Sequence, residues 1–250
     1  MDKNLKDFFL HIADNGLILG HRLSEWCGHG PVLEQDMALS NIALDLIGHA
    51  RFLYQYIAKQ EGSGATEDDY PFKRDVIDFK NILLAEQKNG DFAHTIVRQA
   101  IFDTYNYLFT SQLIKSSNEQ LSGYAQKAIK EVKYHRYFSH EWFTRLGDGT
   151  EESKARMQTA LEKMWPYIDE AFKPAAYETA LLKDNVSVDL SGIKEQFYTE
   201  LSALIDQATL TKPDHAYMQY GGKKGNHSEH LGFILTELQF LQRAYPGQKW

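Results

Sequence analysis

Apolar residues recur every three or four positions along most of the chain, a spacing that places them on one face of an α-helix. The longest proline-free run of this pattern covers residues 33–61. No stretch of useful length alternates apolar and polar residues with the period of two that a half-buried strand requires. The sequence therefore predicts an all-α protein.

Glycine, proline and polar clusters divide the pattern into segments. The predicted helices cover residues 4–28, 33–61, 91–116, 122–146, 151–172, 175–182, 191–210 and 227–245. The pattern does not decide the type of segment 75–86. Four long helices with short connections are typical of a bundle. We therefore expect a single ferritin-like domain over residues 1–250, with a four-helix core at about 4–147 and accessory helices at about 151–250.

The second and fourth long helices each carry one histidine on the apolar stripe. These are His49, three residues after Leu46, and His135, three residues after Val132. A di-iron carboxylate bundle places a glutamate three residues before each such histidine, so that both side chains bind one metal ion. Hydrocarbon replaces both glutamates here, so we expect a degenerate site that holds no metal. His140 lies off this stripe and is expected at the surface.

Three acidic residues remain as candidate ligands. Asp103 lies on the apolar stripe of the third long helix, while Glu25 is the best candidate on the first helix and Asp14 is its rival. Two histidines and one carboxylate would resemble a mononuclear non-haem iron site. An oxygenase that uses His49, His135 and Asp103 is therefore the alternative function. We favour the simpler interpretation that these are core residues satisfied by hydrogen bonds.

A glycine-rich break, YGGKKGNHSEHLG, covers residues 220–232 and precedes the last predicted helix. Glycine permits backbone conformations that other residues avoid. Lys223 and Lys224 bring local positive charge to this break, and His227 follows them. The break is a plain loop that starts a helix, an interface for an acidic partner, or a contact for the phosphates of coenzyme A. The sequence leaves these three interpretations open.

Composition and charge exclude several classes of function and indicate the cellular compartment. The formal net charge of −7 argues against binding to nucleic acid, because phosphate recognition requires a basic face. Cys27 is the only cysteine, which excludes an intramolecular disulfide and a thiolate cluster. The N-terminus lacks the sustained apolar run of a signal peptide, and no apolar stretch is long enough to span a membrane. We expect a soluble cytoplasmic protein.

Several stretches of this sequence are similar to one known family. They are residues 22–58, 83–99, 128–150, 221–232 and 241–250. The run Glu-Trp-Cys-Gly-His at 25–29 and the Gly-Gly-Lys-Lys-Gly loop are the most specific, since helical bundles do not generally contain them. With these features the chain resembles the third subunit of bacterial phenylacetyl-CoA epoxidases, multicomponent ring monooxygenases of phenylacetate breakdown.

The resemblance implies a ferritin-like structural subunit without a working di-iron centre or catalytic residues of its own. It implies three partners: a homologous catalytic di-iron subunit that forms a heterodimer with this chain, a small bridging subunit, and a reductase. The reductase would carry FAD and an iron–sulfur cluster and use NADPH. The assembly would insert one oxygen atom into the aromatic ring of phenylacetyl-CoA. The isolated chain could form a homodimer. Leu46 and Val132 agree with the structural role.

Overall fold

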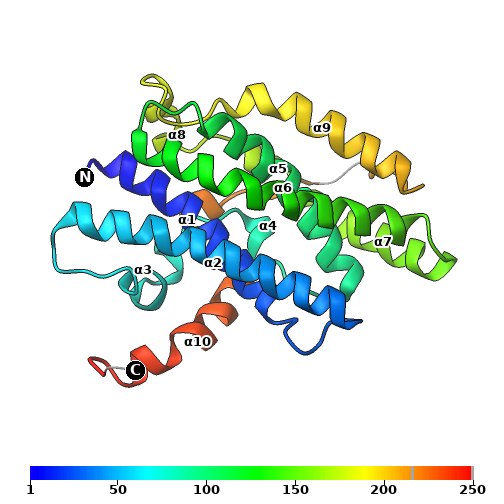
Figure 1. The fold of residues 1–250 in the computed structure, drawn as a ribbon, viewed down its shortest axis with the longest axis horizontal. Helices are drawn as coiled ribbons and strands as arrows, with labels where there is room; N and C mark the ends of the chain where they lie inside the picture. Colours follow the sequence, from blue (N-terminus) through cyan, green and yellow to red (C-terminus); the bar gives the residue numbers. More distant parts are fainter. Residues whose placement is uncertain (215–216, 249–250) are drawn as a thin grey trace. The chain divides into compact units, whose positions relative to one another are not determined.

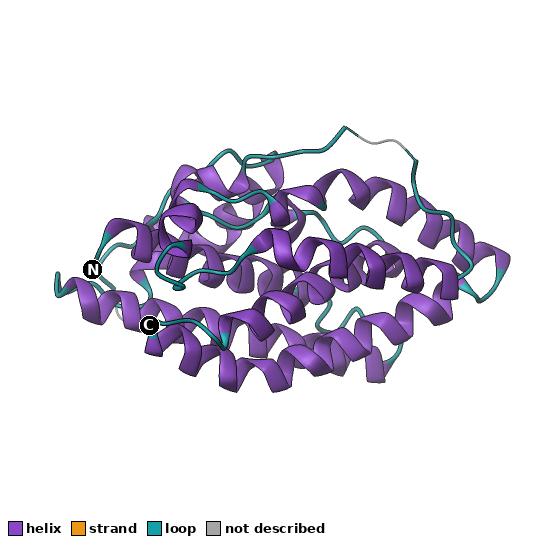
Figure 2. Cartoon of the chain, turned by 90° about the horizontal axis from the view of Figure 1, so that it is seen from above, coloured by secondary structure: helices purple, strands orange, loops and turns teal. Residues whose placement is uncertain are grey.

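The structure, a computed structural model, describes residues 1–214 and 217–248. Within these ranges every regular element is an α-helix or a 3-10 helix, and Figure 2 shows helix and loop only, so the predicted all-α class is confirmed. The chain divides into two compact units. The first unit combines Met1–Lys88 with Tyr220–Trp250, and the second unit is Asn89–Gln219. The prediction of a single domain stays a prediction.

Two long helices form the base of the first unit, α1 (Lys3–Ser24) and α2 (Leu33–Glu61), which run antiparallel side by side in Figure 1. The bounds predicted for the second helix are confirmed. A Cβ atom on Gly16 would lie 2.9 Å from the carbonyl oxygen of Leu46, so glycine lets α1 approach the backbone of α2.

Shorter elements complete the first unit. They are α3 (Asp69–Lys73), the 3-10 helix η1 (Val76–Asp78), α4 (Leu83–Glu86), the 3-10 helix η4 (Gly222–Lys224) and α10 (Glu229–Ala244). α10 packs mainly on α3, and α4 packs on α1. The segment at 75–86, whose type the sequence left undecided, is therefore mostly irregular, with one turn of 3-10 helix and one turn of α-helix.

The second unit is organised around α5 (Phe92–Leu113), which packs against α6 (Glu119–Gly147), α7 (Glu151–Met164) and α9 (Leu190–Gln207). Because neighbours cover most of its circumference, α5 is buried nearly all round, and its buried residues include the polar Arg98, Gln99 and Asp103. The unit also contains η2 (Trp165–Tyr167), η3 (Asp169–Phe172) and α8 (Ala176–Leu182). The helix predicted over 151–172 is thus interrupted near Pro166, which cannot donate a backbone hydrogen bond.

Helix ends follow local capping rules. The side chain of Asp91 accepts a hydrogen bond from the backbone nitrogen of His94 at the start of α5, and Asn118 caps α6 in the same way. Gly62 ends α2 in a left-handed conformation with φ of 61°. No helix in residues 1–214 and 217–248 is both long and apolar enough to cross a membrane.

Candidate functional site

On α2 the two positions that would carry a Glu-x-x-His pair differ in burial. Leu46 is buried, with 2% of its surface exposed, whereas His49 is half-buried. The buried stripe of α2 continues through Ala50 and Leu53, so His49 lies at its edge. The prediction that His49 lies on the buried apolar stripe is therefore wrong in detail. Leu46, at the position where a di-iron bundle has a glutamate, is buried as predicted.

Glu25 lies at the end of α1. The helix stops at Ser24, four residues before the predicted end, and Glu25 is the C-terminal cap. About a third of its side chain is exposed, and its carboxylate accepts a 2.8 Å hydrogen bond from Nη1 of Arg22. This placement does not support Glu25 as an inward-facing ligand.

Asp14, the rival candidate, is fully buried on α1. Its carboxylate accepts hydrogen bonds from Nη1 of Arg74 at 3.0 Å, the hydroxyl of Tyr54 at 2.6 Å and the backbone nitrogen of Lys80 at 2.8 Å. Desolvation lowers the pKa of Arg74, but the charge of Asp14 outweighs it and raises that pKa overall. Asp14 is thus the counter-ion of a buried arginine, with its lone pairs already used.

Asp103 lies in the second unit, on α5, with no exposed surface. Nε2 of Gln99 donates a 2.8 Å hydrogen bond to its Oδ1. Burial raises the pKa of Asp103 to about 7, and the neighbouring side chains of Ser139 of α6 and of Gln99 lower it only in part. A carboxyl in this setting favours its neutral form, which is a poor metal ligand.

On α6, Val132 and His135 are both fully buried, as predicted for the stripe of the fourth long helix. The ring of His135 meets the ring of Tyr134 edge-on, with centroids 6.4 Å apart. The structure therefore places the histidine in the core of the second unit and a hydrocarbon side chain one turn before it.

His140, expected at the surface, takes part in the contact between α5 and α6. Its Nε2 lies 2.8 Å from Oγ1 of Thr104, whose hydroxyl donates to the carbonyl oxygen of Ala100 at 2.7 Å. Since that hydroxyl has one hydrogen, Nε2 of His140 must donate to Thr104. Burial lowers the pKa of His140 to about 4, with a smaller effect from Arg136. The prediction of a surface group is wrong because α5 covers this position.

The donor set does not fit a di-iron carboxylate centre. Leu46 and Val132 offer no oxygen, and Asp14 is held by its own partners. In the described part of the chain, no group of three or more histidine, cysteine, aspartate or glutamate side chains is placed to hold a metal ion. That the protein binds no metal stays a prediction, since it concerns the protein in solution.

A second polar network holds the irregular segment between α3 and α4. Side chains of α1 bond to its backbone: Nδ1 of His11 to the carbonyl oxygen of Lys80 at 2.7 Å, and Oδ1 of Asn15 to the nitrogen of Ile82 at 2.9 Å. Arg22 donates to the carbonyl oxygen of Glu86, the last residue of α4, at 3.0 Å and 3.2 Å and so fixes the end of the segment. Buried backbone groups outside regular structure need such partners.

The glycine-rich loop packs onto the same segment. A Cβ atom on Gly222 would lie 2.2 Å from the carbonyl oxygen of Asn81, and one on Gly225 would lie 2.2 Å from that of Ile77. Gly225 also has a φ of 85°. These two positions require glycine because another backbone runs against them.

The side chains proposed as phosphate contacts differ in accessibility. Lys223 is buried, with 3% of its surface exposed, and the side chain of His227 has no exposed surface. Lys224 is exposed. The loop as folded thus offers only Lys224 of the three to a ligand, which corrects the expectation for Lys223 and His227.

His227 contacts Glu86 of α4, which is fully buried. Nδ1 of His227 lies 2.7 Å from Oε2 of Glu86, and Nε2 lies 2.9 Å from the carbonyl oxygen of Phe79. No local pattern pointed to this pair, because the two residues are 141 positions apart.

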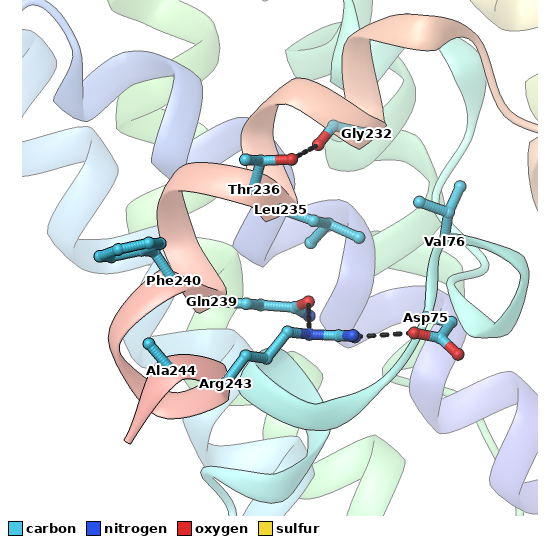
Figure 3. A pocket seen from close by; sticks show the side chains of 9 residues that line it. All are labelled: Asp75, Val76, Gly232, Leu235, Thr236, Gln239, Phe240, Arg243 and Ala244. Carbon is cyan, nitrogen blue, oxygen red and sulfur yellow. Dashed lines mark hydrogen bonds and ion pairs between the residues drawn. The ribbon is translucent and has the colours of Figure 1, made fainter. Parts of the chain in front are cut away.

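Beyond the loop, α10 forms one wall of a groove of about 580 Å³, and residues 75 and 76 form the other (Figure 3). Phe240 and Leu235 line it on the helix side; Leu235 points toward Val76, whereas Phe240 points away from Val76 in Figure 3. Arg243 closes one end with a 2.7 Å ion pair to Asp75. No sequence pattern singled out this groove.

Known proteins match this chain over its whole length. The family described as "Phenylacetic acid catabolic protein" matches residues 1–250. The chain is 44% identical over 246 residues to a 1,2-phenylacetyl-CoA epoxidase subunit of Escherichia coli (strain K12), a match that covers 98% of this chain and 99% of that protein. These matches confirm the family resemblance stated from the sequence, and the ferritin-like class with it.

Proposed function

Because the chain belongs to the family of phenylacetic acid catabolic proteins, we propose that it is a non-catalytic structural subunit of a multicomponent di-iron oxygenase that epoxidises the aromatic ring of phenylacetyl-CoA. The name of the E. coli relative describes one component of an epoxidase. In the proposed assembly, this chain pairs with a homologous catalytic subunit that carries the di-iron centre. A small bridging subunit and an NADPH-dependent reductase with FAD and an iron–sulfur cluster complete it, in the cytoplasm.

One observation carries the proposal. At both positions where a di-iron bundle needs the glutamate of Glu-x-x-His, the side chain is aliphatic and buried, as Leu46 and Val132. A divalent or trivalent ion needs anionic oxygen ligands, and hydrocarbon in their place leaves its charge uncompensated in the interior.

The competing function is an oxygenase with its own mononuclear site at His49, His135 and Asp103. The neutral form that burial favours at Asp103 weighs against it, as does the position of His49 at the edge of the buried stripe. A mononuclear site of this kind needs one anionic carboxylate and two inward-facing neutral imidazoles, and Asp103 and His49 respectively do not fit these two roles well.

Metal analysis separates these two functions. The purified chain is loaded anaerobically with ferrous iron, freed of weakly bound metal and analysed by mass spectrometry. We expect far less than one iron per chain, whereas a catalytic relative with two Glu-x-x-His motifs, treated identically, should retain about two. About one tightly held iron that is lost in His135→Ala would reject the structural role.

Reconstitution tests the role in the assembly. Turnover of phenylacetyl-CoA is measured with the catalytic subunit and reductase, with and without this chain. We expect ring epoxidation to depend on the chain although the chain alone has none. Full activity without it, or the failure of any bundle subunit to co-purify with it from its native cell, would contradict the proposal.

A further inference from the structure

The ring of His227 is bonded at both nitrogens. Nε2 faces a carbonyl oxygen, that of Phe79, which can only accept, so this nitrogen must carry a hydrogen. Nδ1 faces Oε2 of Glu86. Oε1 of Glu86 accepts from the backbone nitrogen of Ser228 at 2.7 Å, and Oε2 also accepts from Nδ2 of Asn81 at 2.8 Å. A carboxylate that accepts on all sides leaves Nδ1 as a donor, so the ring is a charged imidazolium.

The charged groups around this ring favour the same state. Burial lowers the pKa of His227, but the hydrogen bond and charge of Glu86, the carbonyl of Phe79 and the more distant charge of Asp14 raise it overall. Two cationic residues also belong to these surroundings: Arg22 of α1 donates to the carbonyl oxygen of Glu86, and the buried Lys223 lies four positions before His227 in the chain.

The helix that follows this loop, α10, is attached to the first unit by four buried side chains and one exposed ion pair. α10 buries Leu231, Ile234, Leu235 and Gln239. Nε2 of Gln239 donates to the carbonyl oxygens of Pro71 and Arg74. The remaining ion pair of α10, between Arg243 and Asp75, is largely exposed at the end of the groove in Figure 3. An exposed pair contributes little to stability.

We propose that Glu86 and His227 form a clasp that holds residues 220–248, here called the C-terminal strap, on the first unit, and that the strap is released when His227 loses its proton. The clasp is a pH-operated device of this chain, and it does not depend on the proposed enzymatic assembly. Release would uncover the irregular segment between α3 and α4, including Phe79, which is fully buried.

Deprotonation of His227 weakens the clasp because the ring loses one of its two N–H donors. A neutral imidazole has one N–H group, so deprotonation leaves either Glu86 or the carbonyl of Phe79 without its donor. It also leaves the buried Glu86 carboxylate without its nearest positive charge, and breaking a buried pair is costly. Because the attached state has the raised pKa, the clasp is fully effective below 6.5, the ordinary value for histidine, and is lost as the pH rises through the raised value.

Hydrogen exchange of the full-length protein, followed by mass spectrometry from pH 6 to pH 10, tests the release. After correction for the intrinsic chemistry of exchange, peptides from α10 and residues 220–228 should open progressively more at high pH. Peptides from α1 should keep their protection, because the strap opens without global unfolding. Protection of α10 that does not change with pH would overturn the proposal, as would loss of α1 protection in step with it.

Three variants sharpen the test. His227→Gln and Glu86→Gln remove the charges, so the strap should open on the order of a hundredfold more often at pH 6, with its pH dependence lost. His230→Gln is the matched control, because it changes a histidine of the same strap outside the clasp. Equal protection in His227→Gln and His230→Gln would refute the clasp. If a clasp variant does not fold, the pH series on the unmodified chain still decides.

Discussion

Gln99 and Asp103 lie one helical turn apart on α5, and the Gln99 side chain donates a 2.8 Å hydrogen bond to the Asp103 carboxyl in a place where neither residue has exposed surface. This pair occupies the stripe where a metalloprotein would need an ionised ligand. Burial raises the pKa of Asp103 to about 7 instead. The interior of the second unit thus accommodates a carboxyl by favouring its proton.

The titration of Asp103 makes stability depend on pH. The pKa of Asp103 is about 7 in the folded state and 3.8 ordinarily, so between these pH values the folded state binds more protons than the unfolded state. The contribution of Asp103 to the free energy of unfolding therefore falls as the pH rises from 3.8 to about 7. The total change is about 4 kcal/mol. The free energy of unfolding is measured with urea for Asp103→Asn and for the unmodified chain. The difference between them should shift in favour of the variant as the pH rises from 4 to 7. Glu141→Gln, which alters a half-exposed carboxylate of α6, should show no such gain; a flat difference for Asp103→Asn would disprove the assignment.

His140 titrates in the opposite sense. Burial lowers its folded pKa to about 4 from 6.5, so the unfolded state binds more protons between these values and stability rises with pH. The contribution is about 3 kcal/mol and is lost as the pH falls from 6.5 towards 4. In His140→Asn the free energy of unfolding should no longer rise with pH between 4 and 6.5, while the decrease caused by Asp103 should remain. Proton NMR provides the check: the His140 ring should stay neutral at pH 5.5, and a midpoint near 6.5 would be inconsistent with its burial.

Breaking the pair between Asp14 and Arg74 should strongly destabilise the protein. Asp14→Asn leaves the buried guanidinium without its counter-ion, for which we expect a loss of about 3–5 kcal/mol in the free energy of unfolding. Glu67→Gln is the control, because Glu67 pairs with the exposed Arg51 at 3.3 Å and should cost less than about 1 kcal/mol. Similar losses in the two variants would show that burial does not strengthen the first pair.

Two glycines of the C-terminal strap should respond in opposite directions. Gly222→Ala pushes a methyl group into the carbonyl of Asn81, at 2.2 Å, and should destabilise the first unit. Gly232→Ala lies in α10, where a Cβ atom meets nothing within 4 Å, and should stabilise the helix by up to about 1 kcal/mol. Thermal unfolding of both variants gives the comparison. A tolerated Gly222→Ala would mean that the loop does not pack as closely as the structure shows.

What the sequence predicted well depends on neighbouring residues. The bounds of α2 follow from an uninterrupted apolar period and from glycine after Glu61, and the burial of Leu46, Val132 and His135 follows from the same spacing. The end of α1 differs from the prediction by four residues. The turn after Ser24 keeps apolar Trp26 in apparent helical register, so the pattern extends the helix past Glu25.

What it could not predict depends on distant residues. Asp14 finds Tyr54 and Arg74 at separations of 40 and 60 positions, and nothing near Asp14 in the chain signals either partner. For His140 the local pattern indicated solvent, but α5 supplies Thr104 from 36 positions away. Lys223 has the sequence setting of a surface charge, because glycine-rich loops usually are exposed. Its burial follows from close packing of the loop on residues 77 to 83.

The discontinuity of the first unit has a consequence for biosynthesis. The ribosome delivers Glu86 well before His227, and the whole of Asn89–Gln219 emerges between them. A nascent chain can therefore complete the second unit first, whereas the first stays unfinished, with Glu86 lacking its imidazolium counter-ion, until translation is nearly over. A premature stop codon anywhere before codon 220 would yield a polypeptide whose N-terminal helices never receive their last covering segment.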